Sequence, residues 1–395
     1  PSSPSHFDVA ELSEIVEDQR VDIRNSNELT ECVNDIKPDF VFHLAAQALV
    51  RESYNDPVAT YHTNVLGTLN LLEGLRSLEK PCTAILITSD KCYDNVEWVW
   101  GYRESDALGG PDPYSASKGA AELVIRSHIK SFFPQDGKIR IAVGRAGNVI
   151  GGGDWAQDRI VPDCVRFWAN EEILQLRNPQ ATRPWQHVME PLSGYLALAK
   201  ELSENSELQG EPFNFGPPAN HNHSVQELVQ AMSAHWEQVQ WNDVSDTGEQ
   251  HYESGLLKLN CDKALHHLHW QAVLSFQETV RMTAEWYRSY YDNSSKIRDV
   301  TFSQIKEYEA LAQNKIGEGS RNNTLFHYGV YAKKKWPTEW KSRITMFNIQ
   351  AMEKPLSDSE VSIITNQHEK KDWGYKCNDV PMCNLCDKKL CRERK

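Results

Sequence analysis

The chain has 395 residues and a formal net charge of −13, which argues against nucleic-acid binding by the chain as a whole. Its apolar runs are too short for a membrane helix and no secretory signal is visible, so we expect no membrane partner. Five cysteines are scattered through residues 1–314, which is typical of a reduced, cytoplasmic protein.

Residues 1–150 alternate apolar strands with helical stretches. We expect a strand at residues 40–42, a helix around residues 60–65 and a buried strand at residues 84–87. Another helix is expected to begin near Pro113, which suits an entry turn. This alternation predicts an α/β fold with a Rossmann-like, doubly wound parallel sheet.

Residues 151–314 change to loops and short helices, and we expect a smaller domain interleaved with the first. Ser224 and Glu227 have the spacing of a capping box, which predicts that a helix begins there. His266, His267 and His269 lie close together but lack a partner carboxylate or cysteine at ligand spacing. We therefore expect no metal site at these histidines.

Two short segments carry candidate redox chemistry. Tyr114 and Lys118 are four residues apart, so a helix presents both on one face. An ammonium beside a phenol lowers the pKa of the phenol, which predicts that Tyr114 takes a proton from a hydroxyl. Ser89 lies at the carboxyl end of the buried strand at residues 84–87, where its side chain can hold that hydroxyl in place. The plainer alternatives are an ordinary helix start and, at Asp90 and Lys91, an ion pair facing solvent.

With several longer motifs, these segments resemble the extended short-chain dehydrogenase/reductase family, and within it the CDP-glucose 4,6-dehydratases. The motifs are Phe-His-Leu-Ala-Ala-Gln at 42–47, Thr-Ser-Asp-Lys-Cys-Tyr at 88–93, Glu-Trp-Val-Trp-Gly-Tyr-Arg-Glu at 97–104, Tyr-Ser-Ala-Ser-Lys at 114–118, Arg-Ala-Gly-Asn-Val-Ile-Gly-Gly-Gly-Asp-Trp at 145–155 and Arg-Pro-Trp-Gln-His-Val at 183–188. The resemblance extends from residue 1 to about residue 314. Residues 97–102 and 151–155 are specific to these dehydratases.

The resemblance implies an internal redox dehydration of CDP-glucose with NAD as the cofactor. Tyr114 would act as the base at the sugar C4 hydroxyl, with Ser89 as its hydroxyl partner. Asp90 would protonate the departing C6 hydroxyl. Lys91 would remove the C5 proton, which requires a pKa well below about 10.4, and burial near Lys118 is expected to lower it.

The resemblance also implies the binding residues. For NAD they are Asp22, Ile23, Ala45, Ala46, Gln47 and Asn64, together with Tyr114 and Lys118; for the nucleotide sugar they are Asn148, Arg159, Arg183, His187 and Tyr252. Arg183 is the main candidate for the diphosphate, because a guanidinium binds phosphate oxygens bidentately. The alternative for Arg159 is that it is a surface arginine. The alternative for Ala45 and Ala46 is that they are only small residues at a strand-to-helix turn. Residues 151–153, three glycines, are expected to let the backbone approach the sugar.

No strand, glycine-rich turn and helix precede residue 40, although the family uses that unit to bind the NAD pyrophosphate. We therefore expect that the chain is truncated at its amino terminus, that the first strands of the sheet are missing, and that NAD binds weakly or not at all.

Residues 315–395 differ in character, with a formal charge of +6 against −19 in the rest. They resemble the helical carboxy-terminal module of phage and viral DNA primases, so nucleic acid is an expected partner of this module alone. Four cysteines, Cys377, Cys383, Cys386 and Cys391, have spacing that can close a tetrahedral zinc site. The alternatives are free thiols or a redox pair.

Two other functions stay open from the sequence. One is a nucleotide-sugar epimerase of the same fold, although an epimerase needs no acid such as Asp90 for a C6 hydroxyl. The other is a chimeric zinc-containing, nucleic-acid-binding protein with an inactive dehydratase part. The family resemblance further implies a homodimer through the helices around residues 60–76 and 114–131.

Overall fold

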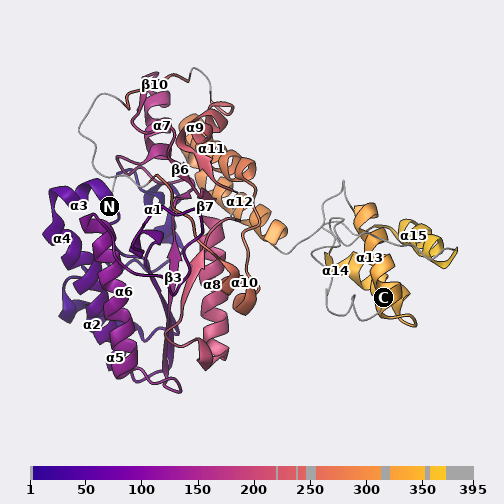
Figure 1. Ribbon diagram of the computed structural model, residues 1–395, viewed down its shortest axis with the longest axis horizontal. Coiled ribbons are helices and arrows are strands. Elements are labelled where there is room, and N and C mark those ends of the chain that lie inside the picture. The colour runs from indigo at the N-terminus through magenta and orange to yellow at the C-terminus, as the bar shows by residue number, and fades with distance from the viewer. Residues whose placement is uncertain are drawn as a thin grey trace. The chain divides into compact units, whose positions relative to one another are not determined.

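A computed structural model gives the structure of the protein (Figure 1). It describes residues 3–218, 221–236, 239–245, 255–312, 321–351 and 356–370. The chain divides into two compact units, Pro1–Ser303 and Gln304–Lys395, and each is described by itself.

The centre of the first unit is a four-stranded sheet in the order β1-β2-β3-β8 (Figure 1). The strands are β1 (Phe40–His43), β2 (Cys82–Ile87), β3 (Ile139–Ala146) and β8 (Pro212–Phe215). All neighbouring pairs are parallel. The predicted parallel α/β sheet is therefore confirmed.

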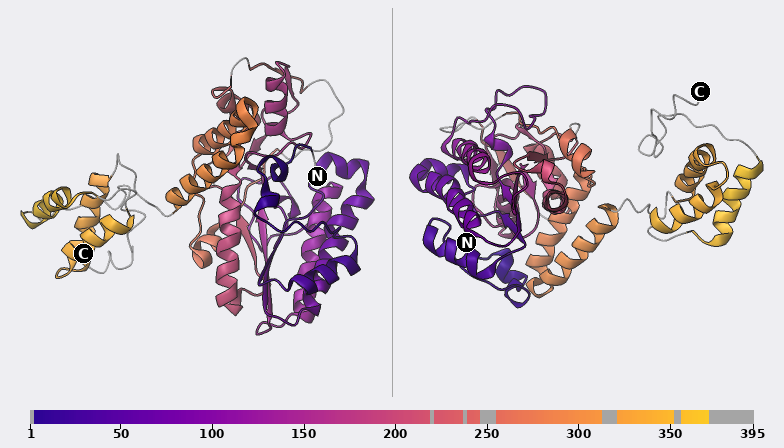
Figure 2. Two further views of the ribbon diagram at one scale, coloured as in Figure 1. Left: turned by 180° about the vertical axis from the view of Figure 1, so that it is seen from behind. Right: turned by 90° about the horizontal axis from the view of Figure 1, so that it is seen from below.

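Helices cover both faces of this sheet, which explains why β2 and β3 are almost continuously apolar. One face packs against α2 (Ser26–Ile36), α5 (Gly67–Ser77) and α6 (Pro113–Phe132), with Leu75 and Ile125 among the contacts. The other packs against α8 (Met189–Glu204), where Tyr195 and Leu198 contact Ile85 and Phe213. Figure 2 shows the sheet between these helices.

Strand β1 is the exposed exception. Phe40 and Phe42 are 47% and 36% exposed, whereas β2 is buried along nearly its whole length. Beyond β1 the chain forms α3 (Val50–Asn55) and α4 (Pro57–Tyr61), and a π-helical turn, His62–Leu66, leads into α5. The helix predicted around residues 60–65 is thus interrupted by a π-turn, a feature often found at functional positions.

A second core lies in the part of the unit after β3. It brings together α7 (Ile160–Ala169), α9 (Val225–Ser233) and α11 (Phe276–Asn293) around Trp168, Leu228 and Trp286. The capping box predicted at Ser224 is confirmed, and a second one begins α11 at Ser275. The shorter strands are β4 (Val149–Ile150), β5 (Leu174–Leu176), β6 (Thr182–Arg183), β7 (Gln186–His187), β9 (His223–Ser224) and β10 (Trp241–Asp243).

The remaining helical segments of the first unit are short or peripheral. They are α1 (His6–Val9), α10 (Asp262–Leu268), α12 (Ile297–Ala312, which continues beyond the unit) and the 3-10 turns Leu12–Glu14, Asp90–Cys92, Ser206–Leu208 and Ser294–Lys296. Within the described ranges, no helix is both long and apolar enough to cross a membrane.

The second unit contains α13 (Arg321–Lys335), α14 (Trp340–Ala351) and α15 (Asp358–Lys370). Leu325, Ile344 and Ile364 form its core. Asn348 joins α14 to the segment before α15, because its amide donates to Leu356 O and accepts from Leu356 N, both at 2.9 Å. The unit therefore has a small hydrophobic core of its own.

Candidate active site

The start of α6 sets the position of Tyr114 and Lys118. Asp112 caps the helix by accepting from Ser115 N at 2.9 Å, and Pro113 occupies the first turn as predicted. Tyr114 N donates to Ser53 Oγ at 3.1 Å, which ties the same turn to α3. The two side chains therefore project from a helix start that is anchored at two points.

Ser89 follows β2 and caps the 3-10 turn Asp90–Cys92. Its hydroxyl accepts from Lys91 N at 3.2 Å and donates to Asp90 Oδ1 at 3.0 Å. This turn packs against α6. The structure therefore brings the two predicted segments together at the carboxyl end of β2, with Ser89, Asp90, Tyr114 and Lys118 all nearly buried.

Asp90 is the most enclosed member of the group. Asn148 donates to its Oδ2 at 3.3 Å, and a β-carbon added to Gly147 would lie 1.8 Å from the same oxygen. Burial raises the pKa of Asp90, while Lys91 and the hydrogen bond from Ser89 act in the opposite direction. A carboxyl held in this way favours its protonated form, so the solvent-facing ion pair considered for Asp90 is not what the structure contains.

The pKa of Tyr114 does not follow the sequence prediction. Burial raises it to about 12, the Asp90 and Asp112 carboxylates add to this, and the hydrogen bond with Ser89 and the charge of Arg159 oppose it. The predicted lowering by Lys118 is wrong for this structure, because desolvation of the phenolate outweighs the attraction of nearby cations.

Burial also disfavours the charged form of Lys118, as it does that of Tyr114. Burial lowers its pKa to about 8, although Cys92 and Glu122 act to raise it. His43, at the end of β1, has its pKa lowered to about 4 by burial and by Lys118. At neutral pH Lys118 therefore remains mainly an ammonium, and His43 is neutral.

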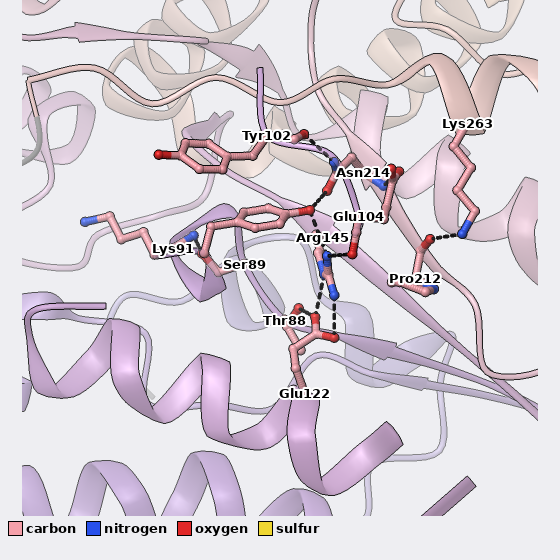
Figure 3. Close-up of polar contacts among 11 residues, drawn as sticks. Thr88, Ser89, Lys91, Tyr102, Glu104, Glu122, Arg145, Pro212, Asn214 and Lys263 are labelled. Carbon is pink, nitrogen blue, oxygen red and sulfur yellow. Dashed lines mark hydrogen bonds and ion pairs between the residues drawn. The ribbon is translucent and has the colours of Figure 1, made fainter. Parts of the chain in front are cut away.

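Lys91 differs from its neighbours because it is only half-buried. Figure 3 shows its side chain extending away from the cluster around Arg145. Its assignment as a neutral base stays a prediction.

The residues predicted to bind the adenosine part of NAD lie near the exposed edge of the sheet. Asp22 is exposed and pairs with Arg24 at 2.6 Å, and hydrogen bonds from Arg24 lower the pKa of Asp22 to about 2. Ile23 packs on Gly67, where a β-carbon would lie 2.6 Å from it. Ala45 is exposed and Ala46 half-buried in the loop after β1.

Asn64 and Gln47 form a closed set of hydrogen bonds. Asn64 Oδ1 accepts from Gln47 N at 2.8 Å, and its amide nitrogen donates to Gln47 O at 3.0 Å and to Ser117 Oγ at 2.9 Å. Gln47 Nε2 donates to Thr60 Oγ1 at 2.8 Å. These amides hold the loop after β1 against α6, and the predicted contact of Asn64 and Gln47 with NAD stays a prediction.

The arginines predicted to bind the nucleotide sugar approach the buried group from the part of the chain after β3. Arg159 precedes α7, is 42% exposed at its side chain and pairs with Asp154 at 2.7 Å. Its charge lowers the pKa of Tyr114, and that of Arg183 lowers the pKa of Asp90. Both guanidinium groups thus act electrostatically on the Tyr114–Asp90 pair.

The other predicted substrate residues have different settings. His187 is buried in β7, its pKa is lowered to about 4 by burial, and its Nε2 has no hydrogen-bond partner among the described residues. The glycines at 151–153 approach protein, not open space: β-carbons on Gly152 and Gly153 would lie 2.0 Å from Trp286 and 2.2 Å from His6. These contacts show close packing on one side of the glycines, and the expected approach of their backbone to a sugar stays a prediction. Tyr252 lies outside the described residues.

The metal predictions are only partly addressed. Among the described residues, no group of histidine, cysteine and acidic side chains can hold a metal ion, which includes His266, His267 and His269. The four cysteines proposed as zinc ligands, Cys377, Cys383, Cys386 and Cys391, lie outside the described residues.

Sequence reasoning gave no role to Glu122 and Arg145, although Arg145 lies in a quoted motif. Arg145 Nε donates to Glu122 Oε1 at 2.7 Å, and both side chains are nearly buried. The available signal was a glutamate within the apolar stretch of α6 and an arginine at the end of a buried strand, because charged residues seldom occupy such positions without a partner.

Comparisons with known proteins agree with this geometry. The family model described as GDP-mannose 4,6 dehydratase matches residues 5–283. The chain is 44% identical over 296 residues to a "CDP-glucose 4,6-dehydratase" of Salmonella typhimurium, covering 73% of this chain and 82% of the relative. It is 26% identical to a "UDP-glucose 4-epimerase" of Mycoplasma pneumoniae, covering 69% of this chain and 82% of the relative.

Solved structures show the same fold. DesIV, a dTDP-glucose 4,6-dehydratase from Streptomyces venezuelae solved with NAD and TYD bound, superposes with a TM-score of 0.58 at 22% identity, covering 74% of this chain and 86% of that chain. RMD from Pseudomonas aeruginosa, complexed with NADPH, has a TM-score of 0.60 at 22% identity, covering 71% of this chain and 94% of that chain. The chain belongs to the family of nucleotide-sugar dehydratases described as GDP-mannose 4,6 dehydratase.

Proposed function

We propose that the chain is a CDP-glucose 4,6-dehydratase, which converts CDP-glucose to CDP-4-dehydro-6-deoxyglucose in deoxysugar biosynthesis. The observation that carries this proposal is Asp90, a buried carboxyl with a raised pKa beside Ser89 and Tyr114. Loss of water from C6 needs such an acid, whereas epimerisation does not. The 44% identity to the Salmonella CDP-glucose 4,6-dehydratase supports the same substrate.

We assign each acid–base step to a residue of the site. NAD held beside Tyr114 and Lys118 would supply the hydride acceptor for C4 and the hydride donor for C6, with no net change of the cofactor. Tyr114 takes the proton of the C4 hydroxyl, which Ser89 orients, and a C4 ketone results. Lys91 then takes the C5 proton, and Asp90 gives its proton to the C6 hydroxyl, which leaves as water. When hydride has returned to C6, the proton held by Lys91 goes back to C5, which completes the product.

With a pKa of about 12, Tyr114 is a protonated phenol at neutral pH, so it can act as the base only after bound ligands lower that pKa. Lys118, with a pKa of about 8, still carries its charge at that pH and lies one helical turn away. We propose that closure of the site over the ligands strengthens the attraction between this ammonium and the developing phenolate.

For the nucleotide we propose Arg183 and Arg159 as the diphosphate partners. Both are accessible enough to reach a ligand, and both act electrostatically on the buried acid–base group. Asn148, which donates to Asp90, is proposed to lie beside the sugar.

For NAD, we assign residues to the two ends of the cofactor, the nicotinamide and the adenosine. Tyr114 and Lys118 would adjoin the nicotinamide, and Asp22, Ile23, Ala45 and Ala46 would adjoin the adenosine. Isothermal titration of the full chain with NAD measures this binding, and a micromolar dissociation constant would contradict the weak binding expected from the sequence.

The test of the function is turnover of CDP-glucose by the full chain at saturating NAD. We expect a 4-keto-6-deoxy product, measured by its absorbance in alkali and by mass spectrometry as a loss of one water. CDP-galactose or UDP-galactose formed from the corresponding glucose compounds, without loss of water, would overturn the proposal in favour of an epimerase.

We also propose that the chain forms a homodimer through the surface of α4, the π-turn, α5 and α6. These elements expose several large apolar side chains: Val58, Tyr61, Leu66, Leu123 and Phe132. Apolar side chains that are exposed together mark interaction surfaces. Light scattering checks the proposal, and a mass that is monomeric for the unsubstituted chain would contradict it.

The domain limits at residues 150 and 314, and the interpretation of residues 315–395 as a primase-type module that binds zinc and nucleic acid, stay proposals. Zinc analysis of the purified chain, with Cys386→Ser as the comparison, tests the metal. Single-stranded DNA binding that is lost on chelation tests the partner.

A further inference from the structure

A buried ion pair lies beside the candidate acid–base group. Arg145 donates from Nε to Glu122 Oε1 at 2.7 Å and from a terminal nitrogen to Oε2 at 2.8 Å, so the contact is bidentate (Figure 3). Replacing such a pair with apolar side chains of similar size is often neutral for stability. Stability of the fold is therefore a weak explanation for its presence.

Hydrogen bonds connect the pair to the elements that carry the candidate groups. Glu122 Oε1 accepts from Thr88 Oγ1 at 2.6 Å, and Thr88 directly precedes Ser89. Arg145 donates to the Tyr93 hydroxyl at 2.7 Å, and Tyr93 directly follows the turn that contains Asp90. Because Glu122 is on α6 with Tyr114 and Lys118, the pair connects this helix to the segment that carries Ser89 and Asp90. Figure 3 shows the contacts of Glu122 with Thr88 and Arg145.

The pair also supplies charge near Lys118. Three titratable groups interact with this amine: His43 from β1, Cys92 from the 3-10 turn and Glu122 from α6. His43 is neutral at pH 7 because its pKa is about 4, and burial raises the pKa of Cys92 so that its thiol is also neutral. Of the three, Glu122 is the one in an ion pair with Arg145, and it raises the pKa of Lys118.

We propose, on the basis of the function proposed above, that Glu122 and Arg145 are positioning residues for the dehydration. Through Thr88 and Tyr93 they hold Ser89 and Asp90 in register with Tyr114 and Lys118. The carboxylate of Glu122 also favours the ammonium form of Lys118. They act through these neighbours and not by contact with the substrate.

Two variants of the full chain test the proposal. Glu122→Gln keeps the size and the acceptor for Thr88 but removes the charge. We expect kcat to fall about tenfold or more with KM nearly unchanged, and the pKa of Lys118 to fall by about one unit. That pKa is read by NMR of 13C-labelled lysine, with Lys118→Met for assignment. Glu285→Gln, which breaks an exposed ion pair with Arg281, is the matched control and should change neither quantity.

The double variant Glu122→Met with Arg145→Met removes both charges. We expect its melting temperature to remain near that of the unsubstituted chain while its kcat falls, and it decides the matter if Glu122→Gln does not fold. Unchanged kcat and an unchanged Lys118 titration in either variant would overturn the inference. Absence of turnover by the unsubstituted chain would instead overturn the proposed function, and the Lys118 titration would still report on Glu122.

Discussion

The two halves of the candidate site are built in different ways. One half contains Ser89, Asp90, Tyr114 and Lys118, which are nearly buried at the end of β2, in a 3-10 turn and in α6. Burial is the main cause of the pKa shifts of Asp90, Tyr114 and Lys118. Arg159 and Arg183 lie on a helix cap and a two-residue strand and keep contact with water.

This difference in burial corresponds to the two proposed roles, acid–base chemistry for the buried residues and substrate binding for the two arginines. Groups that are already desolvated have strong electrostatic interactions, but charge on them costs stability. Arginines that keep contact with water destabilise the fold little, and they can bind an anionic ligand such as a phosphate. Substitutions in the buried half should therefore change turnover or stability, and those in the exposed half should change affinity.

The largest effect is expected for Tyr114→Phe. The change removes only the hydroxyl, so the fold should persist while kcat falls by roughly a hundred- to ten-thousand-fold. Steady-state turnover of CDP-glucose measures it. Tyr291→Phe, at an exposed position of α11, is the control. A Tyr114→Phe variant with more than a tenth of normal kcat would exclude Tyr114 as the base.

Asp90→Asn should reduce kcat by roughly a hundredfold or more, because the amide cannot give a proton to the C6 hydroxyl. The pKa of Asp90 is raised, so activity of the unsubstituted chain should also fall as the pH rises and this carboxyl ionises. Turnover measured across pH checks both statements. Asp136→Asn, at an exposed turn, should have no effect. Retained dehydration by Asp90→Asn would assign the acid elsewhere.

Lys118→Met separates stability from activity. The folded-state pKa of about 8 is depressed from 10.5, so the stability linked to this group is present above pH 10.5 and is lost as the pH falls through 8. At pH 7 the buried ammonium should cost about 3 kcal/mol, and Met should recover much of that while turnover is lost. Urea unfolding at pH 7 and pH 10 measures it. A variant that is less stable at pH 7 would contradict the sign.

Arg183→Gln should act mainly on binding. Loss of a charged hydrogen bond to phosphate corresponds to about ten- to a hundredfold in KM, with kcat nearly unchanged. Arg343→Gln, in an exposed pair with Glu339, serves as the control. A fall in kcat at unchanged KM would place Arg183 in the acid–base half and remove the contrast between the two halves.

The sequence was sufficient for features with a strong local pattern. Apolar runs and helix formers predicted the parallel sheet and the common helix of Tyr114 and Lys118, and Ser224 with Glu227 predicted a capping box. Each depends on residues close together in the chain.

Features that depend on three-dimensional surroundings could not be read in this way. The direction of the Tyr114 pKa follows from burial that no short motif encodes. The contacts of Asn64 with Gln47 and Ser117 join segments up to 53 residues apart. The glycines at 151–153 are explained by Trp286 and His6, which are remote in sequence.

Gly147 places an evolutionary limit on the site. Its α-hydrogen faces the Asp90 carboxyl, and a methyl group there would overlap that carboxyl at 1.8 Å. The placement of an acid thus depends on the smallest side chain at a position 57 residues later in the chain. Homologous sequences that retain the dehydration should show glycine at this position, whereas homologues that have lost it are free to carry alanine or serine.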